Sequence, residues 1–233
     1  MRFGADRLIV NEIFGPTLQG EGVSAGRTAV FLRLAYCNLK CTFCDTTYSW
    51  DWTRYDIRDE AELMRVDTIA ARLTDLSSTQ LLVVTAGEPL LQAPGLVGLL
   101  RKLDGHREVE VETSGTVVPH EDLWSLVARF NVSPKLSGSG MTAGRALRDQ
   151  PIAAFAERPG VVWKFVVATK DDLAEVREVV DRFQLANVFL MAEGVTLEAQ
   201  IEGMRALAPI CVENNWSLSP RMHVQLWGDT RSV

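Results

Sequence analysis

Three cysteines near the start of the chain are the residues whose spacing says most about chemistry. Cys37, Cys41 and Cys44 form a C-x3-C-x2-C pattern, and Asp45 and Thr46 follow directly. A short turn with this spacing lets three thiolates reach adjacent corners of a four-iron cube. The fourth iron then lacks a protein ligand, and S-adenosylmethionine offers an amino and a carboxylate group for such an open position. The pattern therefore predicts radical chemistry with a [4Fe-4S] cluster and this cofactor.

The alternative interpretation of this loop is a structural zinc site in a binding module without catalysis. Such a site takes four ligands, usually as two pairs a dozen or more residues apart. The remaining cysteine is Cys211, and the histidines lie far along the chain at His106, His120 and His223. The uneven spacing without a second pair favours the cluster, although a distant fourth ligand keeps zinc open at this stage.

Length and composition set the limits for the fold. With 233 residues, of which 47% are hydrophobic, the chain can form one domain over residues 1–233 with a normal core. The net charge of −6, without a concentrated basic block, argues against wrapping nucleic acid. The first residues lack the apolar segment of a signal peptide, and three clustered thiols suit a reducing compartment, so we expect a cytoplasmic protein.

Strands and helices alternate along the chain after the cysteine loop. We expect strands at residues 8–14, 29–35, 81–85, 108–112, 129–132, 161–167, 188–191 and near 217–223. We expect helices at residues 60–76 with Asp67 as N-cap, 90–103, 171–183 and 197–207. This alternation predicts a parallel sheet. Six or so βα units are too few for a complete barrel of about 250 residues, so we predict an α/β fold with a partial, splayed (β/α)6-type TIM barrel.

Polar residues mark places where a ligand could bind. Gln19 and Glu21 alternate with glycines that let the backbone lie close to a ligand. A plain surface turn explains those glycines but not the two side chains together, and both interpretations stay open. Arg33 interrupts an apolar strand, where an unpaired charge is costly, so we expect it to face an anionic ligand or a carboxylate.

Two loops have alternative interpretations from composition alone. Asp45, Thr46 and Thr47 offer hard oxygens that suit Mg²⁺. The same residues make ordinary turns, which the spacing favours. The glycine-rich residues 138–144 are typical of an exposed loop, with a lid over substrate as the alternative.

Six motifs, taken together and in order, resemble one branch of the radical S-adenosylmethionine superfamily, the 7-carboxy-7-deazaguanine synthase family. They are Gln19-Gly-Glu-Gly22, Arg33-Leu-Ala-Tyr-Cys-Asn38, Cys44-Asp-Thr46, Thr85-Ala-Gly-Glu-Pro89, Glu112-Thr-Ser-Gly115 and Ser133-Pro-Lys135. The match extends from about residue 8 to residue 223. Each glycine motif alone is a weak signal, whereas six at these spacings are specific.

The resemblance implies a partial radical S-adenosylmethionine barrel that works as a homodimer, with a flavodoxin- or ferredoxin-type electron donor. The implied reaction converts 6-carboxy-5,6,7,8-tetrahydropterin to 7-carboxy-7-deazaguanine with loss of ammonia, a step toward queuosine and other 7-deazapurines. The chain would then be a carbon–nitrogen lyase. The rival enzyme with the same cluster loop is an activase that places a glycyl radical on a partner protein.

The resemblance also implies roles for single residues. The expected metal ligands are Cys37, Cys41 and Cys44 for the cluster and Thr46 for Mg²⁺, which reverses the preference for a turn. Residues expected around S-adenosylmethionine are Gly87, Glu88, Thr113, Ser114, Ser133 and Lys135. Residues expected at the pterin are Leu18, Gln19, Glu21, Arg33, Thr85 and His223. Those expected to be catalytic are Glu21, Arg33 and His223.

The chemistry of the side chains supports these roles, and the sequence differs from the family pattern at two places. The planar fork of Arg33 can bind both oxygens of a carboxylate, and Glu21 can accept hydrogen bonds from the guanidine-like edge of a pterin. His223 could donate to the substrate or move a proton, or be an ordinary strand-end histidine. Ala86 replaces a usual glycine and costs roughly 1 kcal/mol if its φ is positive. Residues 227–233 also differ from the family, so their part in closing the pterin site stays open.

Overall fold

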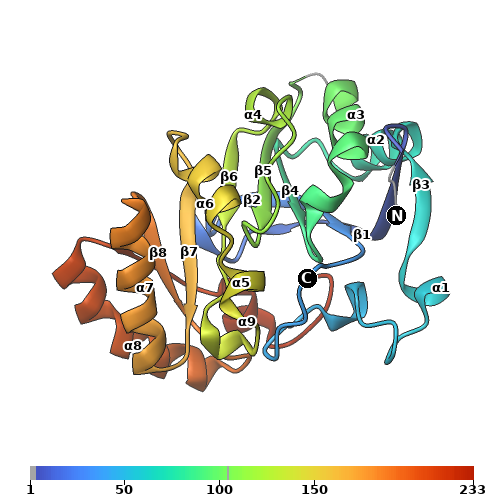
Figure 1. Ribbon diagram of the computed structural model, residues 1–233. Coiled ribbons are helices and arrows are strands. Elements are labelled where there is room, and N and C mark those ends of the chain that lie inside the picture. The colour runs from blue at the N-terminus through green and yellow to red at the C-terminus, as the bar shows by residue number, and fades with distance from the viewer. Residues whose placement is uncertain (1–3, 104) are drawn as a thin grey trace.

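The structure is a computed structural model that describes residues 4–103 and 105–233. In this part of the chain nine strands form one sheet (Figure 1). They are β1 (Arg7–Leu18), β2 (Thr28–Leu34), β3 (Glu62–Arg65), β4 (Leu81–Thr85), β5 (Glu108–Thr113), β6 (Arg129–Val132), β7 (Val162–Val167), β8 (Val188–Ala192) and β9 (Ser217–Ser219). Their order across the sheet is β3-β1-β2-β4-β5-β6-β7-β8-β9.

The sheet is parallel from β2 to β9, whereas β1 runs antiparallel to both β2 and β3. The order begins at β3 and ends at β9, so the ladder of the described strands does not close on itself. The register places Arg33 of β2 opposite Thr85 of β4 at the carboxyl ends of these strands. The predicted α/β fold with a partial, splayed barrel is confirmed.

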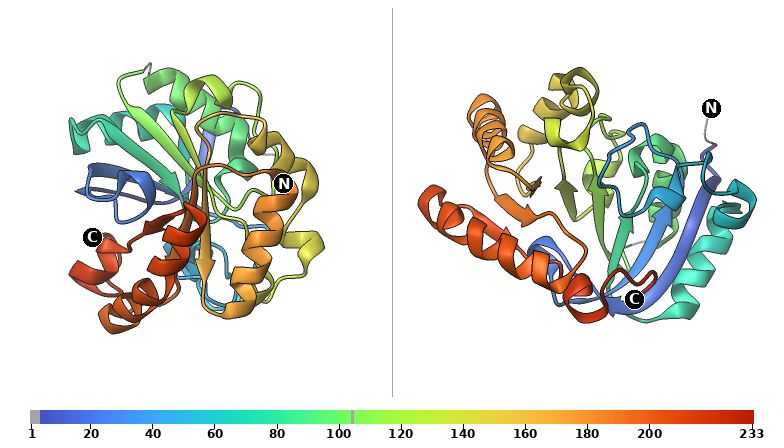
Figure 2. Two further views of the ribbon diagram at one scale, coloured as in Figure 1. Left: turned by 90° about the vertical axis from the view of Figure 1, so that its left-hand side faces the viewer. Right: turned by 90° about the horizontal axis from the view of Figure 1, so that it is seen from below.

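Helices connect the strands and cover the outside of the sheet. The α-helices are α1 (Ile57–Glu60), α2 (Val66–Leu76), α3 (Ala93–Leu103), α4 (Leu123–Leu126), α5 (Ala143–Ala146), α6 (Asp149–Ala156), α7 (Lys170–Phe183), α8 (Leu197–Asn214) and α9 (Met222–Trp227). Short 3-10 turns are η1 (Gly22–Ser24), η2 (Thr47–Ser49), η3 (Pro89–Gln92) and η4 (Ser137–Ser139). Figure 2 shows α7 and α8 along one flank of the sheet and α2 along the other, with the C-terminal end close to β1.

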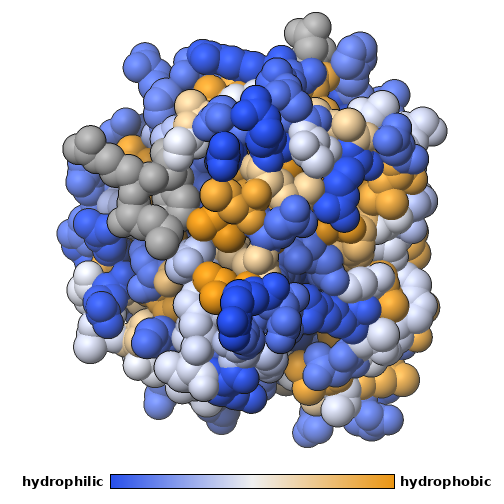
Figure 3. Space-filling view, turned by 90° about the vertical axis from the view of Figure 1, so that its right-hand side faces the viewer, coloured by the Kyte–Doolittle hydropathy of each residue, from blue (hydrophilic) through white to orange (hydrophobic). Residues whose placement is uncertain are grey.

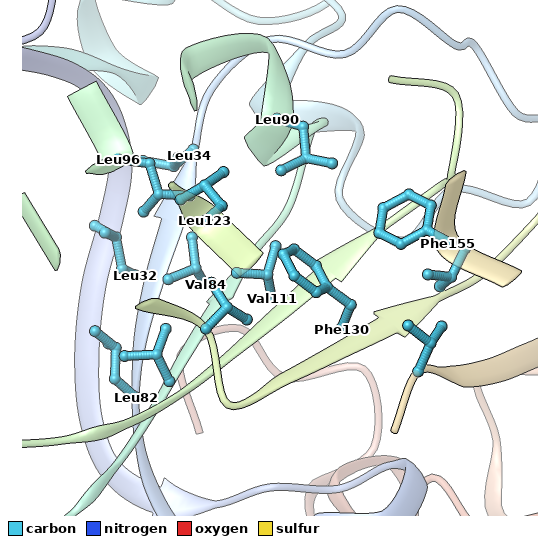
Figure 4. Close-up of a cluster of buried hydrophobic side chains, with 14 of the residues drawn as sticks. Leu32, Leu34, Leu82, Val84, Leu90, Leu96, Val111, Leu123, Phe130 and Phe155 are labelled. Carbon is cyan, nitrogen blue, oxygen red and sulfur yellow. The ribbon is translucent and has the colours of Figure 1, made fainter. Parts of the chain in front are cut away.

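The core lies between the central strands and the helices that cover them. Figure 4 shows Leu32, Val84, Val111 and Phe130, which come from the successive strands β2, β4, β5 and β6. All four are buried in one cluster with Phe155 of α6, whose ring packs edge to face on Phe130 at a centroid distance of 5.4 Å. This packing holds the four strands side by side, and so fixes the spacing of their carboxyl ends.

Residues 60–76 differ from the prediction of one helix with Asp67 as N-cap. Residues 62–65 form β3, which pairs with β1 at the edge of the sheet. The helix therefore begins only at Val66, and its N-cap position is Arg65, whose side chain makes no capping hydrogen bond. Pairing with β1 overrides the local helical propensity of residues 60–65, since propensity is a weak influence beside tertiary contacts.

The C-terminal part also departs from the prediction. The last strand covers only residues 217–219, and α9 begins at Met222, so His223 lies on a helix rather than at a strand end. Helix α8 continues past Leu207 to Asn214 with Pro209 inside it. Ile210 and Cys211 continue its apolar pattern, but a proline normally ends a helix, so the prediction stopped before Pro209.

The face shown in Figure 3 is covered mainly by hydrophilic residues, with apolar side chains in small groups between them. Within residues 4–103 and 105–233, no helix combines the length and the apolar character that crossing a bilayer requires. The described strands share one sheet. The expectation of a single domain over residues 1–233 stays a prediction.

Candidate active site

A cavity of about 890 Å³ opens at the carboxyl ends of the parallel strands. This volume lies in the range of ligand pockets, and this edge is where α/β barrels assemble their active sites. Its walls include residues that follow or end successive strands, namely Thr85, Ala86, Gly87, Thr113, Ser114, Ser133 and Lys135. The motifs separated in the sequence therefore meet at one place.

The cysteine loop forms one side of this cavity. Cys37, Cys41 and Cys44 all line it, and all three are free and partly exposed. A tight turn joins the last two, since the amide of Cys44 donates to the carbonyl of Cys41 at 3.3 Å. Three soft thiolates beside an open volume suit a cluster that binds one thiolate at each of three irons and leaves the fourth iron for another ligand.

The same residues do not form a closed site for a single ion. Among the described residues, no group of three His, Cys, Asp or Glu side chains could hold one metal ion. Cys211 is buried, and its thiol donates to the carbonyl of Ser217 at 3.5 Å. A structural zinc takes four ligands on one ion, and Cys211, the remaining cysteine, is bound elsewhere. The arrangement of donors favours the cluster.

A partly exposed lysine, Lys135, stands beside the cysteine loop. Burial raises the pKa of the Cys37 thiol to about 12, and burial also raises the pKa of Cys41, against which the charge of Lys135 acts. Lys135 is held by the carbonyl and hydroxyl oxygens of Ser133, both at 2.8 Å from its Nζ. Burial lowers the pKa of Lys135 itself. Iron binding requires thiolates, and a cation next to Cys41 favours that form.

Residues 138–144 support the cysteine loop from outside. The amide of Thr42 donates to the carbonyl of Ser139 at 3.0 Å, and the amide of Lys40 contacts Met141 Sδ at 3.3 Å. A Cβ on Gly140, whose φ is +75°, would lie 2.7 Å from the methyl group of Thr42. The segment therefore packs against the loop that carries the thiols, and Ser139 is buried there.

Glu88 is buried behind the wall of the cavity rather than exposed on it. Its carboxylate accepts hydrogen bonds from the hydroxyl of Thr113 at 2.8 Å and from the amide and hydroxyl of Ser114 at 2.8 and 2.5 Å. It also accepts from the amide of Leu90 at 3.1 Å and so caps η3. Glu88 thus fixes Thr113 and Ser114, which do line the cavity.

The backbone at residues 86–87 is left-handed and tightly packed. A Cβ on Gly87 would lie 2.1 Å from the carbonyl oxygen of Tyr36, so only glycine fits there. Ala86 has a φ of +57°, the conformation for which the usual glycine would be suited. An L-residue with a Cβ pays roughly 1–2 kcal/mol for it. Ala86 therefore has the positive φ that was the condition for this cost.

Glu21 is the most strongly paired acidic residue of the site. It is almost buried, forms an ion pair with Lys164 of β7, and accepts from Arg221 Nε at 3.0 Å. Burial alone would raise the pKa of Glu21, but Lys164, Arg221 and His223 outweigh it and hold the pKa well below the ordinary value. Arg221 also pairs with Asp45, which follows the last cysteine of the loop.

A second carboxylate, Glu112, joins three strands next to this group. It accepts from the hydroxyl of Thr85 at 2.7 Å and from the side-chain amide of Gln19 at 3.2 Å. Lys164 Nζ lies 3.9 Å from Glu112 Oε1, between the two carboxylates. Gln19 and Thr85, expected from the resemblance at the pterin, are therefore fixed by a common partner.

Arg33 meets a carboxylate, as expected from its place in a buried strand. Its Nε donates to Glu12 of β1 at 3.1 Å, and both side chains are largely buried. The guanidinium carbon lies 5.2 Å from the ring centre of Phe14 and 5.7 Å from that of Tyr48. Glu12 and these two rings fix the plane of the guanidinium at the cavity wall.

The C-terminal residues lie along the same wall. Arg231 stacks on Tyr48 with its guanidinium carbon 3.9 Å from the ring centre. It pairs with Glu12 at 3.3 Å and with Glu60 at 2.8 Å, and the hydroxyl of Ser232 also donates to Glu12. Residues 228–233 all line the cavity. This segment forms part of the cavity wall.

The remaining expected residues also border the cavity. Leu18 and Thr46 line it, and the Thr46 hydroxyl lies 3.6 Å from Cys44 Sγ. His223 Nε2 lies 3.9 Å from Glu21 Oε1, and burial lowers the pKa of His223. All the expected site residues lie around one cavity, with only Glu88 set behind its wall.

Sequence reasoning missed three charged residues of this site. Lys164 interrupts the apolar strand at residues 161–167, the same signal that identified Arg33, and could have been found by that argument. Glu112 stands inside a recognised motif without an assigned role. Arg221 follows Ser219-Pro220 in a loop of ordinary composition, where nothing local indicates that it reaches the cavity.

Comparison with known proteins agrees with this geometry. The model of the Radical SAM superfamily matches residues 33–135. A 7-carboxy-7-deazaguanine synthase of Pyrobaculum aerophilum is 39% identical over 229 residues, which cover 97% of each chain. The chain belongs to the 7-carboxy-7-deazaguanine synthase family. A 7-carboxy-7-deazaguanine synthase of Halobacterium salinarum is 33% identical and covers 95% of this chain and 91% of its own.

Two solved structures have a fold similar to that of this chain. The crystal structure of QueE from Escherichia coli superposes with a TM-score of 0.68 at 24% identity, and the match covers 91% of this chain and 93% of that one. Streptococcus suis SuiB bound to its precursor peptide SuiA gives 0.55 at 13% identity over 78% of this chain and 46% of that one.

The predicted family is therefore confirmed. The chain is a radical S-adenosylmethionine enzyme, with a [4Fe-4S] cluster and S-adenosylmethionine as cofactors. The glycyl-radical activase and the zinc-stabilised binding module are not favoured.

Glu21, Lys164 and Arg221 form a buried charge group, which a replacement of Glu21 tests. Glu21→Gln should lower the free energy of unfolding by about 3 kcal/mol, because buried Lys164 and Arg221 lose the carboxylate they share and keep only Glu112 and Asp45 as partners. Adding Lys164→Met should restore part of the loss. Urea unfolding measures both. Glu108→Gln at the exposed pair with Arg27 is the control, with an expected change within about 1 kcal/mol. Equal losses in Glu21→Gln and the control would contradict this.

Acid should affect the wild type more than Glu21→Gln. A carboxyl whose folded pKa is depressed stabilises the protein above the pKa of unfolded glutamate, about 4.3. This contribution is lost as the pH falls through the lower folded pKa. Urea midpoints measured from about pH 6 to about pH 3 should fall more steeply for the wild type. Parallel slopes would mean that Glu21 is not held ionised.

Ala86→Gly should stabilise the protein. The left-handed strain at Ala86 is relieved, and the greater freedom of glycine in the unfolded chain offsets part of the gain, which leaves roughly 0.5–1 kcal/mol. Ala71→Gly, on the exposed side of α2, is the matched control and should destabilise by about 1 kcal/mol. Thermal or urea unfolding distinguishes them. A loss of stability in Ala86→Gly would show that the backbone there is not strained.

Proposed function

We propose that this enzyme converts 6-carboxy-5,6,7,8-tetrahydropterin to 7-carboxy-7-deazaguanine with loss of ammonia, on the route to queuosine and other 7-deazapurines. The observation that carries the proposal is a single cavity that joins the cysteine loop to Glu21 and Arg33. Such a cavity has room for a cofactor on the thiol side and a flat, charged substrate on the other. The names of the relatives, 7-carboxy-7-deazaguanine synthase, state the same product.

Arg33 is the residue we assign to the carboxylate of the substrate. Glu12 binds Arg33 at Nε, so the terminal nitrogens of the planar fork are the part suited to two carboxylate oxygens. Phe14 and Tyr48 flank the guanidinium and limit its rotation. A fixed fork at the wall of the cavity would set the direction in which a pterin carboxylate points.

Glu21 is assigned to the guanidine-like edge of the pterin. That edge presents N–H donors, and an ionised carboxylate offers only acceptors. Lys164 and Arg221 keep Glu21 ionised and aimed, so its remaining lone pairs are available without a change of protonation. His223, whose lowered pKa leaves it neutral near pH 7, is the residue we assign to hold or move a proton at the substrate.

The cofactors supply, when bound, a carbon-centred radical able to remove a hydrogen atom from the substrate. Cys37, Cys41 and Cys44 would hold the cluster, and Gly87, Thr113, Ser114, Ser133 and Lys135 would surround S-adenosylmethionine. The chain itself has to fix the substrate at van der Waals distance and exclude water. The C-terminal residues and the buried charge group around Glu21 serve that purpose in this proposal.

Further parts of the proposal concern the metal and the partners. Thr46 would bind Mg²⁺, which keeps most of its positions for water or substrate oxygens. A flavodoxin- or ferredoxin-type protein would supply electrons to a homodimer of single-domain chains. We assign the enzyme to the cytoplasm, because three free thiols at a cavity wall need a reducing compartment.

Anaerobic turnover tests the reaction. Reconstituted enzyme with S-adenosylmethionine, reductant, Mg²⁺ and the carboxytetrahydropterin should produce 7-carboxy-7-deazaguanine, followed by absorbance and mass spectrometry. Cys41→Ala should lose the brown colour and the cleavage of S-adenosylmethionine, since one cluster ligand is absent. Cys211→Ala is the control and should keep both. Cleavage of the cofactor without a deazaguanine product from any pterin would reject the proposed substrate.

Thr46→Ala tests the magnesium site. We expect the stimulation of turnover by Mg²⁺ to weaken, because one oxygen ligand is lost, while the iron content stays that of the wild type. Thr53→Ala, at an exposed position that does not line the cavity, is the control. An unchanged Mg²⁺ titration would remove Thr46 from the metal ligands.

A further inference from the structure

The indole of Trp50, outside the cysteine motif, contacts the thiol of Cys44 directly. The indole Nε1 of Trp50 donates to Cys44 Sγ at 3.2 Å. An indole nitrogen can only donate, so the direction of this hydrogen bond is fixed. None of the roles assigned above uses Trp50, which is partly exposed and lines the cavity.

The position of Trp50 is set by its neighbours rather than by the sulfur. Trp50 directly follows η2, and its amide donates to the carbonyl of Thr47 at 3.1 Å. The preceding Ser49 is fully buried, and its carbonyl accepts from the amide of Tyr36 at 2.8 Å. The backbone that carries Trp50 is thus tied to the residue next to Cys37, at the other end of the cysteine loop.

The three thiols have different electrostatic surroundings. Cys37 Sγ accepts from the amide of Leu39 at 3.4 Å, and Cys41 lies near the ammonium of Lys135. Cys44 has the indole of Trp50 at 3.2 Å and, farther away at 3.6 Å, the hydroxyl of Thr46, which can donate or accept. The amide belongs to the backbone, and Lys135 lies among the expected cofactor contacts. Trp50 is therefore the donor whose removal alters one sulfur and leaves the other two unchanged.

We propose that Trp50 raises the reduction potential of the cluster through its hydrogen bond to Cys44. Reduction adds negative charge that the thiolate sulfurs share, and an N–H aimed at a sulfur stabilises the reduced form more than the oxidised one. Trp50 is thus a positioning residue that makes the first electron transfer easier. The inference depends on the cluster and not on the identity of the substrate.

Trp50→Phe tests the inference on reconstituted enzyme without substrate. It keeps an aromatic ring and removes the donor. We expect the ratio of reduced to oxidised cluster at a fixed ambient potential to fall roughly tenfold, which corresponds to about 59 mV for a one-electron couple. A potentiometric titration followed by electron paramagnetic resonance measures this, with equal iron and sulfide content as the condition for comparison.

Trp52→Phe is the matched control. Trp52 lies two residues on and packs edge to face on Tyr36 at 5.6 Å, and its buried Nε1 has no hydrogen-bond partner. The same substitution there should leave the potential unchanged. A fall of similar size in both variants would mean that the effect comes from packing, and an unchanged potential in Trp50→Phe would overturn the inference.

A spectroscopic measurement on the wild type needs no substitution. Enzyme labelled with ¹⁵N at the tryptophan indoles should show a ¹⁵N hyperfine coupling to the reduced cluster, and Trp50→Phe should lose it while Trp52→Phe keeps it. Absence of the coupling in the wild type would also overturn the inference. A shift in potential together with failure to turn over the pterin would reject the proposed substrate and retain the role of Trp50.

Discussion

A buried carboxylate between two buried cations is the constraint on which the site depends. Glu21 follows β1 and Lys164 lies on β7, while Arg221 follows β9. Removing these charges from water is costly unless they stay paired, so each fixes the others. Backbone bonds add to this, since the amide of Met222 donates to the carbonyl of Gly20 at 2.9 Å. The ladder of the described strands does not close, and this charge group connects β7 to the segments that follow β1 and β9.

The same group links the two halves of the cavity. Arg221 reaches Asp45 beside the last cysteine as well as Glu21 on the substrate side. A displacement of the cysteine loop would therefore also move Glu21, because the planar guanidinium of Arg221 contacts both. Radical chemistry needs reacting atoms held at short distance. Arg221 suits this need, because its contacts fix the cysteine loop relative to Glu21.

Patterns within short segments predicted much of this structure. The alternation of strands and helices gave the parallel sheet, and the strand interrupted by Arg33 correctly indicated a carboxylate partner, Glu12. What failed depends on contacts distant in the chain: β3 forms because β1 offers an edge, and Arg221 reaches Glu21 only after the sheet has curved. Glu88 is assigned by its motif to the cofactor, yet its hydrogen bonds to Thr113 and Ser114 turn its carboxylate inward. A motif states which residues are required, but not which of them faces the ligand.

The C-terminal residues have a practical consequence. Arg231 stacks on Tyr48, Ser232 donates to Glu12, and Val233 lines the cavity. A proteolytic cut near Gly228 would therefore remove part of the cavity wall beside the partners of Arg33. The integrity of this segment should be checked by mass spectrometry before kinetic work.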